Sequence, residues 1–269
     1  MLNPNLFNTY LVFPILNLLI LFYKVFLFIK LPGAFGFAIV ALTASVRLLF
    51  QPFFKKQMDT AAKMQELKPH LDRLGEKHKN DKKALQQEQM KLYQQAGINP
   101  ASGCLFMIIQ IPVFIALYNT LSLFFTNGNL AKVITQINNV LYAPFLKITS
   151  IDPWFFGFNL AVTPKQSGAW YYLLIPIVTG LLQYFQAVSM TPPTSSIVNK
   201  TSEVKSDAGD FQKAMSTQMK YLFPVMIGWF SYTLPVGLSL YWNIFSLFSI
   251  IQGKKLKVDP NKQIQGNDK

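Results

Sequence analysis

Arg47 is the residue of this sequence whose charge is most costly at its position. It lies inside an apolar stretch, Gly33 to Phe54, about seven residues or ~10 Å of helix from the end of that stretch. A permanently charged guanidinium near the centre of a membrane helix costs about 2.5 to 3.5 kcal/mol to insert, so it usually faces protein or water. The alternative is a side chain that snorkels past Phe50 to the headgroups.

Polar residues of the apolar stretches are candidates to line a site around Arg47. Thr43 lies one helical turn earlier and shares its face. Gln110, Trp242 and Asn243 supply further polar atoms at membrane depth. The apolar stretches contain no Asp or Glu, so we expect water or an incoming guest molecule to satisfy the guanidinium.

The residue patterns that covalent or metal chemistry needs are missing from the sequence. There is no glycine-rich phosphate loop, no Ser-His-Asp candidate and no metal-ligand cluster. Cys104 stands alone, and His70 and His78 have no third ligand nearby. The absence of carboxylates from the apolar stretches also argues against a proton-driven transporter. We therefore expect no enzymatic activity, no metal and no cofactor.

Composition indicates which elements must position these residues. The 269 residues are 51% hydrophobic and only 14% charged, whereas soluble domains carry about 25% charged residues. The apolar residues come in blocks long enough to cross a hydrocarbon core of ~30 Å. The sequence predicts an all-α membrane protein with five transmembrane helices, at residues 33–54, 101–126, 169–190, 215–234 and 235–252.

Residues 1–32 precede the first confident span and allow two interpretations. The run from 6 to 29 is apolar but interrupted by polar residues, and Lys24 and Lys30 lie near its end. These lysines favour an amphipathic helix in the outer membrane interface. The alternative is an additional span, which would move the N-terminus to the inner side.

The longest polar segment, residues 55–100, predicts a helical hairpin that projects from the membrane. Apolar residues recur at spacings of three and four, as at Leu67, Leu71 and Leu74, and a charged turn follows near residue 80. Gly97 and Pro100 end the second helix. The remaining segments are predicted to be an extracytoplasmic loop, a cytoplasmic connector and a basic cytoplasmic tail, at residues 127–168, 191–214 and 253–269.

The distribution of basic residues predicts the orientation. Nineteen Lys and Arg lie in residues 55–100, 191–220 and 253–269, against five on the other side of the five-span arrangement. Because cytoplasmic loops carry the excess of positive charge, we expect the hairpin, the connector and the C-terminus in the cytoplasm. The formal net charge of +13 is explained by this topology, so a specific nucleic-acid partner is not expected.

Four runs of the sequence together resemble the YidC family of membrane protein insertases, in its short form without the large extracytoplasmic domain. The resemblance extends from about Pro14 onward. The runs are TASVRLLFQP, AAKMQELKPHLDRLGEKH, NPASGCLFMIIQIPVFIALY and PVGLSLYWNIFSLFSIIQ, at residues 43–52, 61–78, 99–118 and 235–252.

The resemblance implies a fold, a site and partners. It implies five helices around a hydrophilic groove that is open to the cytoplasm and lipid, with a flexible hairpin that receives substrates. Arg47 matches the positive charge of that groove. Groove positions are also assigned to Thr43, Gln110, Tyr241, Trp242 and Asn243. The implied partners are nascent membrane proteins in the bacterial cell membrane, with a Sec-type translocon and the ribosome, and no small-molecule substrate.

Two positions depart from the sequence pattern of the family, and two alternative functions stay open at this point. Trp242 stands where some relatives have a second tyrosine, and Phe106 where many have proline. One rival function is a channel or solute transporter that uses the same polar groove. The other is a structural assembly factor whose hairpin binds partners while Arg47 snorkels.

Overall fold

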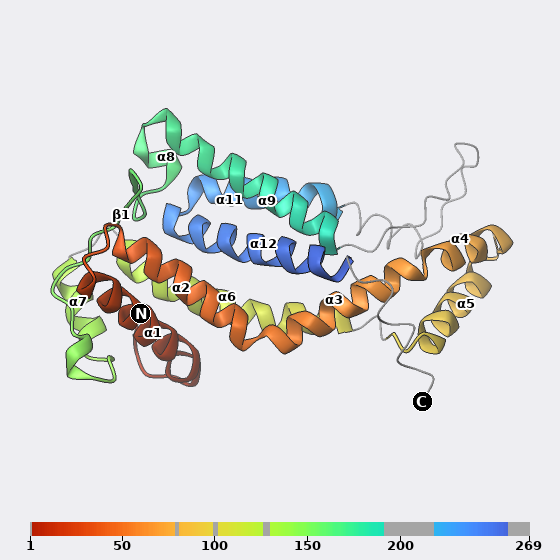
Figure 1. Ribbon diagram of the computed structural model, residues 1–269, viewed down its shortest axis with the longest axis horizontal. Coiled ribbons are helices and arrows are strands. Elements are labelled where there is room, and N and C mark those ends of the chain that lie inside the picture. Colours follow the sequence, from red (N-terminus) through yellow and green to blue (C-terminus); the bar gives the residue numbers. More distant parts are fainter. Residues whose placement is uncertain (1, 79–80, 99–101, 126–129, 191–217, 258–269) are drawn as a thin grey trace.

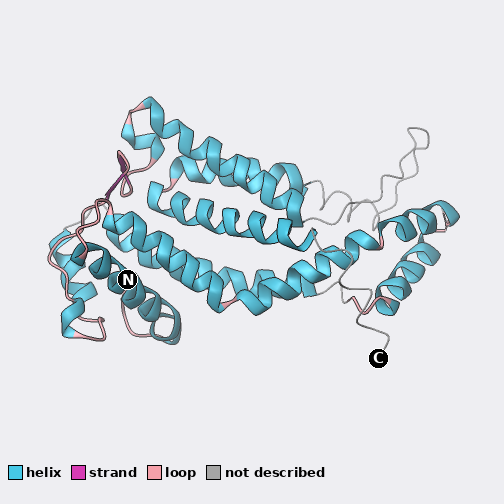
Figure 2. Cartoon of the chain, viewed as in Figure 1, coloured by secondary structure: helices cyan, strands magenta, loops and turns pink. Residues whose placement is uncertain are grey.

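The computed structural model describes residues 2–78, 81–98, 102–125, 130–190 and 218–257. Most of these residues are helical, and the few strand residues form one small hairpin (Figure 2). The predicted connector at 191–214 lies outside the described residues. The predicted tail at 253–269 begins within a helix that reaches Lys257, and its remainder also lies outside the described residues.

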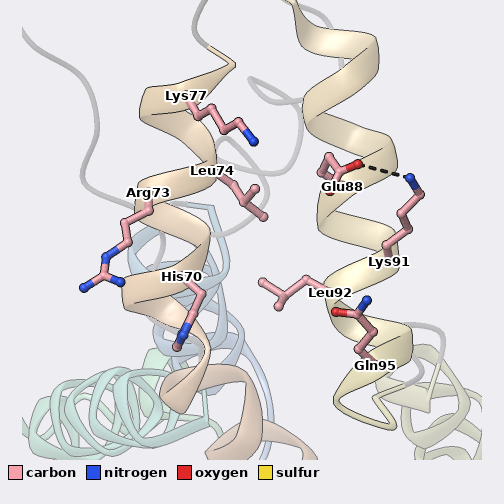
Figure 3. Close-up of a pocket in the computed structure, with 8 residues that line it drawn as sticks. All are labelled: His70, Arg73, Leu74, Lys77, Glu88, Lys91, Leu92 and Gln95. Carbon is pink, nitrogen blue, oxygen red and sulfur yellow. Dashed lines mark hydrogen bonds and ion pairs between the residues drawn. The ribbon is translucent and has the colours of Figure 1, made fainter.

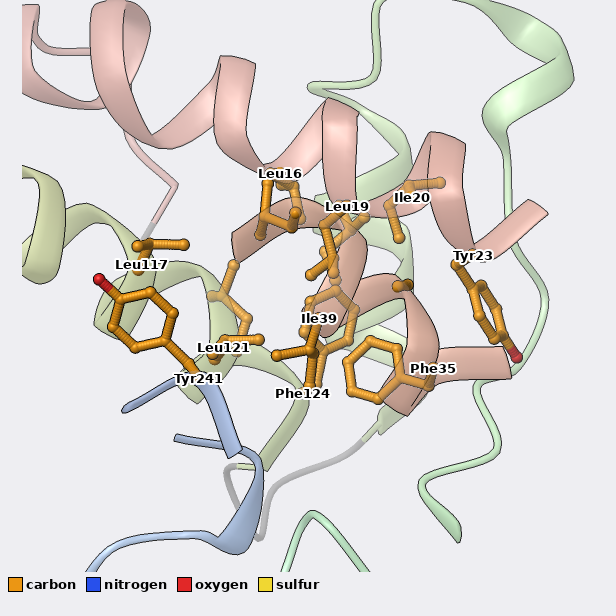
Figure 4. Close-up of a cluster of buried hydrophobic side chains, with 14 of the residues drawn as sticks. Leu16, Leu19, Ile20, Tyr23, Phe35, Ile39, Leu117, Leu121, Phe124 and Tyr241 are labelled. Carbon is orange, nitrogen blue, oxygen red and sulfur yellow. The ribbon is translucent and has the colours of Figure 1, made fainter. Parts of the chain in front are cut away.

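The first helix packs along the second through one apolar stripe. A π-helical segment, η1 (Asn8–Val12), leads into α1 (Phe13–Phe28), and α2 spans Ala34–Leu49. Residues of α1 at spacings of three and four are fully or almost fully buried and face Phe35 and Ile39 of α2. Figure 4 shows this cluster, which α6 and Tyr241 complete; the stripe consists of Leu16, Leu19, Ile20 and Tyr23.

The segment predicted as one span, residues 33–54, is divided by a bend. Helix α2 ends at Leu49, α3 (Gln51–Glu66) begins two residues later, and the two helices meet at 66°. Pro52 has no N–H to continue the hydrogen-bond pattern of α2, whereas proline is well accommodated in the first turn of a new helix such as α3. The bend brings Phe54, on α3, back over the last turn of α2.

Beyond α3, two shorter helices form the predicted hairpin. Helix α4 (Lys68–Lys77) has Pro69 in its first turn, and α5 (Lys82–Gln95) begins after Asp81, whose carboxylate accepts a hydrogen bond from the Ala84 N–H. The hairpin lies at one end of the molecule (Figure 1). A small apolar cluster joins its two helices at their base; it consists of Leu71, Tyr93 and Ile98.

The opposite end of the molecule carries short elements that follow the long helix α6 (Ser102–Phe125). Segment 127–168, predicted to be a loop, contains several of them. Strand β1 pairs antiparallel with β2, and the Phe155 ring packs against Gly36, where α2 has no side chain. The elements are α7 (Leu130–Asn138), η2 (Pro144–Leu146), β1 (Trp154–Phe155), β2 (Phe158–Asn159) and α8 (Pro164–Ser167).

The C-terminal helices form a second layer against α2. Helix α9 packs on both α11 and α12, and α12 packs on α2. Gly180 and Gly228 let α9 and α11 approach closely, because a Cβ at Gly228 would lie 3.2 Å from the Pro176 carbonyl oxygen. The elements are η3 (Trp170–Leu173), α9 (Leu174–Met190), η4 (Gln218–Leu222), α11 (Phe223–Thr233) and α12 (Val236–Lys257).

Length and composition make three helical segments of the described chain suitable to cross a membrane, or four if the bent pair α2–α3 counts as one span. The three are Asn8–Phe28, Trp170–Ser189 and Val236–Gly253, while Ile111–Phe124 is a shorter apolar helix. The predicted count of five spans therefore stays a prediction. Asn8–Phe28 is long enough to span, so the choice between a span and an interfacial helix also stays open.

Candidate functional site

Arg47 lies in the last turn of α2 and is buried inside the molecule. Only 1% of the residue is exposed. The buried face of α2 runs through Phe35, Ile39 and Thr43, and Arg47 is the next residue at a spacing of four. The helical period that buries the apolar residues of α2 therefore also carries the guanidinium into the protein.

Three different elements surround the guanidinium. Its Nη2 donates a hydrogen bond to Oε1 of Gln252 on α12, at 2.8 Å. The guanidinium carbon lies 3.5 Å from the ring centroid of Phe54 on α3 and 4.7 Å from that of Phe245 on α12. Aromatic ring faces attract cations, and desolvation strengthens that attraction. Arg47 is therefore held between α2, α3 and α12 and does not snorkel to the surface.

The contacts leave part of the hydrogen-bonding capacity of Arg47 unused. Its Nε and Nη1 are buried and have no hydrogen-bond partner among the described residues. Within the same residues, no carboxylate oxygen lies within 4 Å of the guanidinium. A buried cation without a carboxylate is a strong attractor for an anion or for water. The amide of Gln252 supplies one partner that the sequence did not indicate, and the expectation that water or a guest satisfies the remaining N–H groups stays a prediction.

The residues of α12 that meet Arg47 follow one face of that helix. Phe245 is four residues after Tyr241, and Gln252 is seven residues after Phe245. Tyr241 is 2% exposed and lies close enough to Arg47 to interact electrostatically with it. Sequence reasoning included Tyr241 but missed Phe54, Phe245 and Gln252. The spacings of four and eleven residues from Tyr241 are the signal that would have found the two on α12.

The other predicted groove residues occupy different environments. Thr43 is buried, but its hydroxyl donates to the Ile39 carbonyl oxygen of its own helix at 2.7 Å. The indole of Trp242 stacks on Phe114 of α6, with ring centroids 5.1 Å apart and planes 21° apart. Asn243 is half-buried, and its Oδ1 has no hydrogen-bond partner among the described residues.

Gln110, the remaining predicted groove residue, lies within α6, and its side chain lies outside what the structure describes. Its position relative to Arg47 stays a prediction. Ser246, three residues after Asn243 and therefore on the same side of α12, is 1% exposed, and its Oγ has no hydrogen-bond partner among the described residues. The polar surface of α12 therefore extends beyond the residues that the sequence singled out.

A separate set of buried hydroxyls connects the helices of the second layer. The Ser231 hydroxyl on α11 donates to Thr179 Oγ1 on α9 at 3.2 Å. The Ser231 and Ser239 hydroxyl oxygens lie 2.7 Å apart, and Ser239 belongs to α12. All three residues are fully buried. Hydrogen bonds of this kind hold membrane helices together, so this set positions α12 rather than performing chemistry.

Known proteins that resemble this chain match it over most of its length. A family model described as "60Kd inner membrane protein" matches residues 27–261. The chain is 34% identical to the chloroplastic inner membrane ALBINO3-like protein 2 of Chlamydomonas reinhardtii, over 85% of this chain and 51% of that protein. It is 33% identical to membrane protein insertase YidC of Caulobacter vibrioides, over 87% of this chain and 35% of that protein.

A third relative adds to this agreement. The chain is 32% identical to membrane protein insertase YidC of Allorhizobium ampelinum, over 84% of this chain and 32% of that protein. The chain thus spans between a third and a half of the length of these relatives. The resemblance found in the four sequence runs is confirmed, and the chain belongs to the 60Kd inner membrane protein family, which includes the YidC insertases.

Proposed function

We propose that this chain is a membrane protein insertase and chaperone that helps integral membrane proteins to enter the bilayer and fold. Family membership and the names of two relatives, both membrane protein insertase YidC, support the proposal. The observation that carries it in the structure is the burial of Arg47 with two guanidinium nitrogens that have no partner among the described residues.

Several buried polar atoms of α2 and α12 have hydrogen-bonding capacity that the described residues leave unused. Arg47 Nε and Nη1, Asn243 Oδ1 and Ser246 Oγ are buried and lack hydrogen-bond partners within the described part of the chain. Buried polar atoms are normally satisfied by protein or by water, so these are the atoms that a polar client segment can bind. They form the proposed hydrophilic groove, together with Thr43, Gln110, Tyr241 and Trp242.

Two effects drive the proposed step: the electrostatic attraction of the client by Arg47 and the transfer of the client's apolar segment into lipid. A hydrophilic, often acidic, segment of a nascent membrane protein enters the groove part-way and is attracted by Arg47. The attraction is stronger there than in bulk water, because the surroundings have a low dielectric constant. The apolar segment of the client transfers into lipid, which supplies the free energy, so ATP is not needed for this step.

Phe54 and Gln252 must yield before a client can reach the guanidinium, because they contact it in this structure. Phe54 belongs to α3, which continues toward the hairpin of α4 and α5. Movement of α3 relative to α2, about the bend at Phe50, is the proposed way to open the groove. The hairpin is the proposed receiver of clients.

The sidedness of the molecule follows from the distribution of basic residues. The hairpin, the connector and the C-terminus are placed in the cytoplasm, and the end that carries α7, α8 and the strands is placed outside. Figure 1 shows the hairpin and the end that carries α7, α8 and the strands on opposite sides of the helical bundle. The proposed location is the bacterial cell membrane, with a Sec-type translocon and the ribosome as partners.

The experiment that tests the proposal measures insertion of a client with an acidic translocated tail into proteoliposomes. Arg47→Ala should lower insertion about tenfold, equivalent to ~1.4 kcal/mol of lost attraction. Arg47→Lys should retain much of it, because the charge matters more than the guanidinium shape. Lys147→Ala is the matched control, since it removes one positive charge from an exposed position.

Two results would count against the proposal. Equal insertion by wild type and Arg47→Ala, for acidic and uncharged tails alike, would remove the electrostatic part. Ion or solute flux through liposomes that contain only this protein would favour the transporter. A crosslink from Thr43 or Gln110 to a ribosome-bound nascent chain would separate the insertase from a purely structural assembly factor.

A further inference from the structure

The two helices of the hairpin pack on each other at their base, where α4 begins and α5 ends. At the base, Leu71 of α4 and Tyr93 of α5 are buried together with Ile98. Farther from the base, Lys77 on α4 and Glu88 on α5 are among the residues that line the space between the helices. This space is a cleft of about 270 Å³.

The cleft combines an apolar floor with a basic rim. Leu74 and Leu92 extend into it from opposite helices and are half-buried (Figure 3). The other lining residues are three cations, one carboxylate, one imidazole and one amide; they are Arg73, Lys77, Lys91, Glu88, His70 and Gln95.

Among the described residues, the positive charges of the cleft that have no ion-pair partner within 4 Å lie on α4. Glu88 and Lys91, both on α5, form an ion pair at 3.1 Å. Within the described residues, Arg73 and Lys77 have no carboxylate within 4 Å. The α4 side of the cleft is therefore basic, while the α5 side is close to neutral.

We propose that this cleft binds an acidic amphipathic helix of a partner protein. The partner's apolar side chains would lie on Leu74 and Leu92, and its carboxylates would face Arg73 and Lys77. A helix with leucines on one stripe and carboxylates beside that stripe matches both features at once. The inference does not depend on the proposed insertase function, because it concerns binding at the hairpin alone.

Other ligands of a basic surface fit the cleft less well. No Phe, Tyr or Trp lines the cleft to stack on a base, so single-stranded nucleic acid lacks a stacking platform there. A lipid headgroup is confined to the bilayer surface, whereas the hairpin projects from the end of the helical bundle (Figure 1). The leucine floor also favours a peptide over an isolated phosphate group.

The test measures binding of a fluorescent synthetic peptide to the full chain in detergent micelles by anisotropy. The peptide is a helix with Leu at spacings of three and four and Glu beside the leucines. The double variant Arg73→Glu with Lys77→Glu should weaken binding at least about tenfold, because two attractive contacts become repulsive. Leu74→Ala should weaken binding separately, without a change in charge.

A matched double variant controls for charge alone. Lys63→Glu with Lys83→Glu makes the same change in net charge at exposed positions outside the cleft lining, and should leave peptide affinity unchanged. Circular dichroism of each variant confirms that the hairpin is folded. Peptide affinity that is equal in wild type and in the Arg73 and Lys77 variant would overturn the inference. The inference would also be overturned if the chain bound single-stranded RNA or phosphatidylglycerol vesicles instead of the peptide, and if the Arg73 and Lys77 variant lost that binding.

Discussion

The helical bundle and the α4–α5 hairpin are stabilised in opposite ways. One apolar cluster runs through the bundle and joins α1, α2, α6 and α12, whereas three buried side chains form the core of the hairpin. Helices α4 and α5 pack mainly on each other and on the end of α3. The hairpin is therefore free to change position or partner without a large change in the contacts of the bundle.

Polar groups show the same contrast. In the bundle, several buried polar groups bond within the protein, as Thr43 does to its own helix and Ser231 to Thr179 and Ser239. The ion pair that the described part of the chain contains, Lys91 with Glu88, is exposed on the hairpin. Buried polar contacts fix one arrangement of helices, while exposed charges exchange partners easily. The bundle is thus suited to hold a site and the hairpin to recruit.

Truncation of one core residue in each region is expected to give the largest difference. Phe35 is fully buried and contacts the rings of Tyr23 and Phe124, so Phe35→Ala should lower the free energy of unfolding by about 3–5 kcal/mol. Leu71→Ala in the hairpin should leave the thermal unfolding of the bundle unchanged. Thermal unfolding in detergent measures both variants. Similar losses in both would show that the regions unfold together.

Replacement of the whole hairpin sharpens the comparison for function. A Gly/Ser linker in place of residues 68–95 should keep the melting temperature of the bundle, because α4 and α5 contribute little to its core. Client insertion into proteoliposomes should fall severalfold, because the proposed receiver is lost. Full insertion activity by the replaced chain would refute a receiving role for the hairpin.

Gln252 offers a test inside the bundle with a matched pair of variants. Gln252→Leu removes the acceptor for Arg47 Nη2 and should lower the free energy of unfolding by about 1–3 kcal/mol. Gln252→Glu keeps an acceptor and adds a negative charge, so it should preserve stability. It should nevertheless reduce insertion of acidic clients, because the carboxylate neutralises Arg47. Unimpaired insertion of acidic tails by Gln252→Glu would contradict the role given to that charge.

The smallest effect is expected from acidification of the hairpin. The hydrogen bond and charge of Lys91 lower the pKa of Glu88 below its ordinary value. Because the pKa is lowered, the ion pair contributes fully to the stability of the hairpin above the usual glutamate pKa of about 4.3. This contribution is lost as the pH falls through the lowered pKa. Glu88→Gln should remove this acid-side change in helicity, measured by circular dichroism. The change should be small, because both side chains are exposed.

Much of the architecture was predictable from local patterns. The apolar blocks predicted the helices at α6, α9 and α12, and the spacing of Leu67, Leu71 and Leu74 predicted the hairpin. The helix at α7 and the strand pair were not predicted within segment 127–168, because they are short and stabilised by contacts with other segments. The bend at Phe50 was missed, since the apolar block continues through it to Phe54.

The sequence by itself determined that a permanent cation is placed among apolar residues, since no neighbour in the same helix can neutralise Arg47. Only the tertiary structure decided what surrounds that cation. Gln252 is 205 residues away along the chain, and it meets Arg47 because α12 packs on α2. Helical periodicity determines which face of each helix is buried, but which faces meet depends on how all the helices fit together.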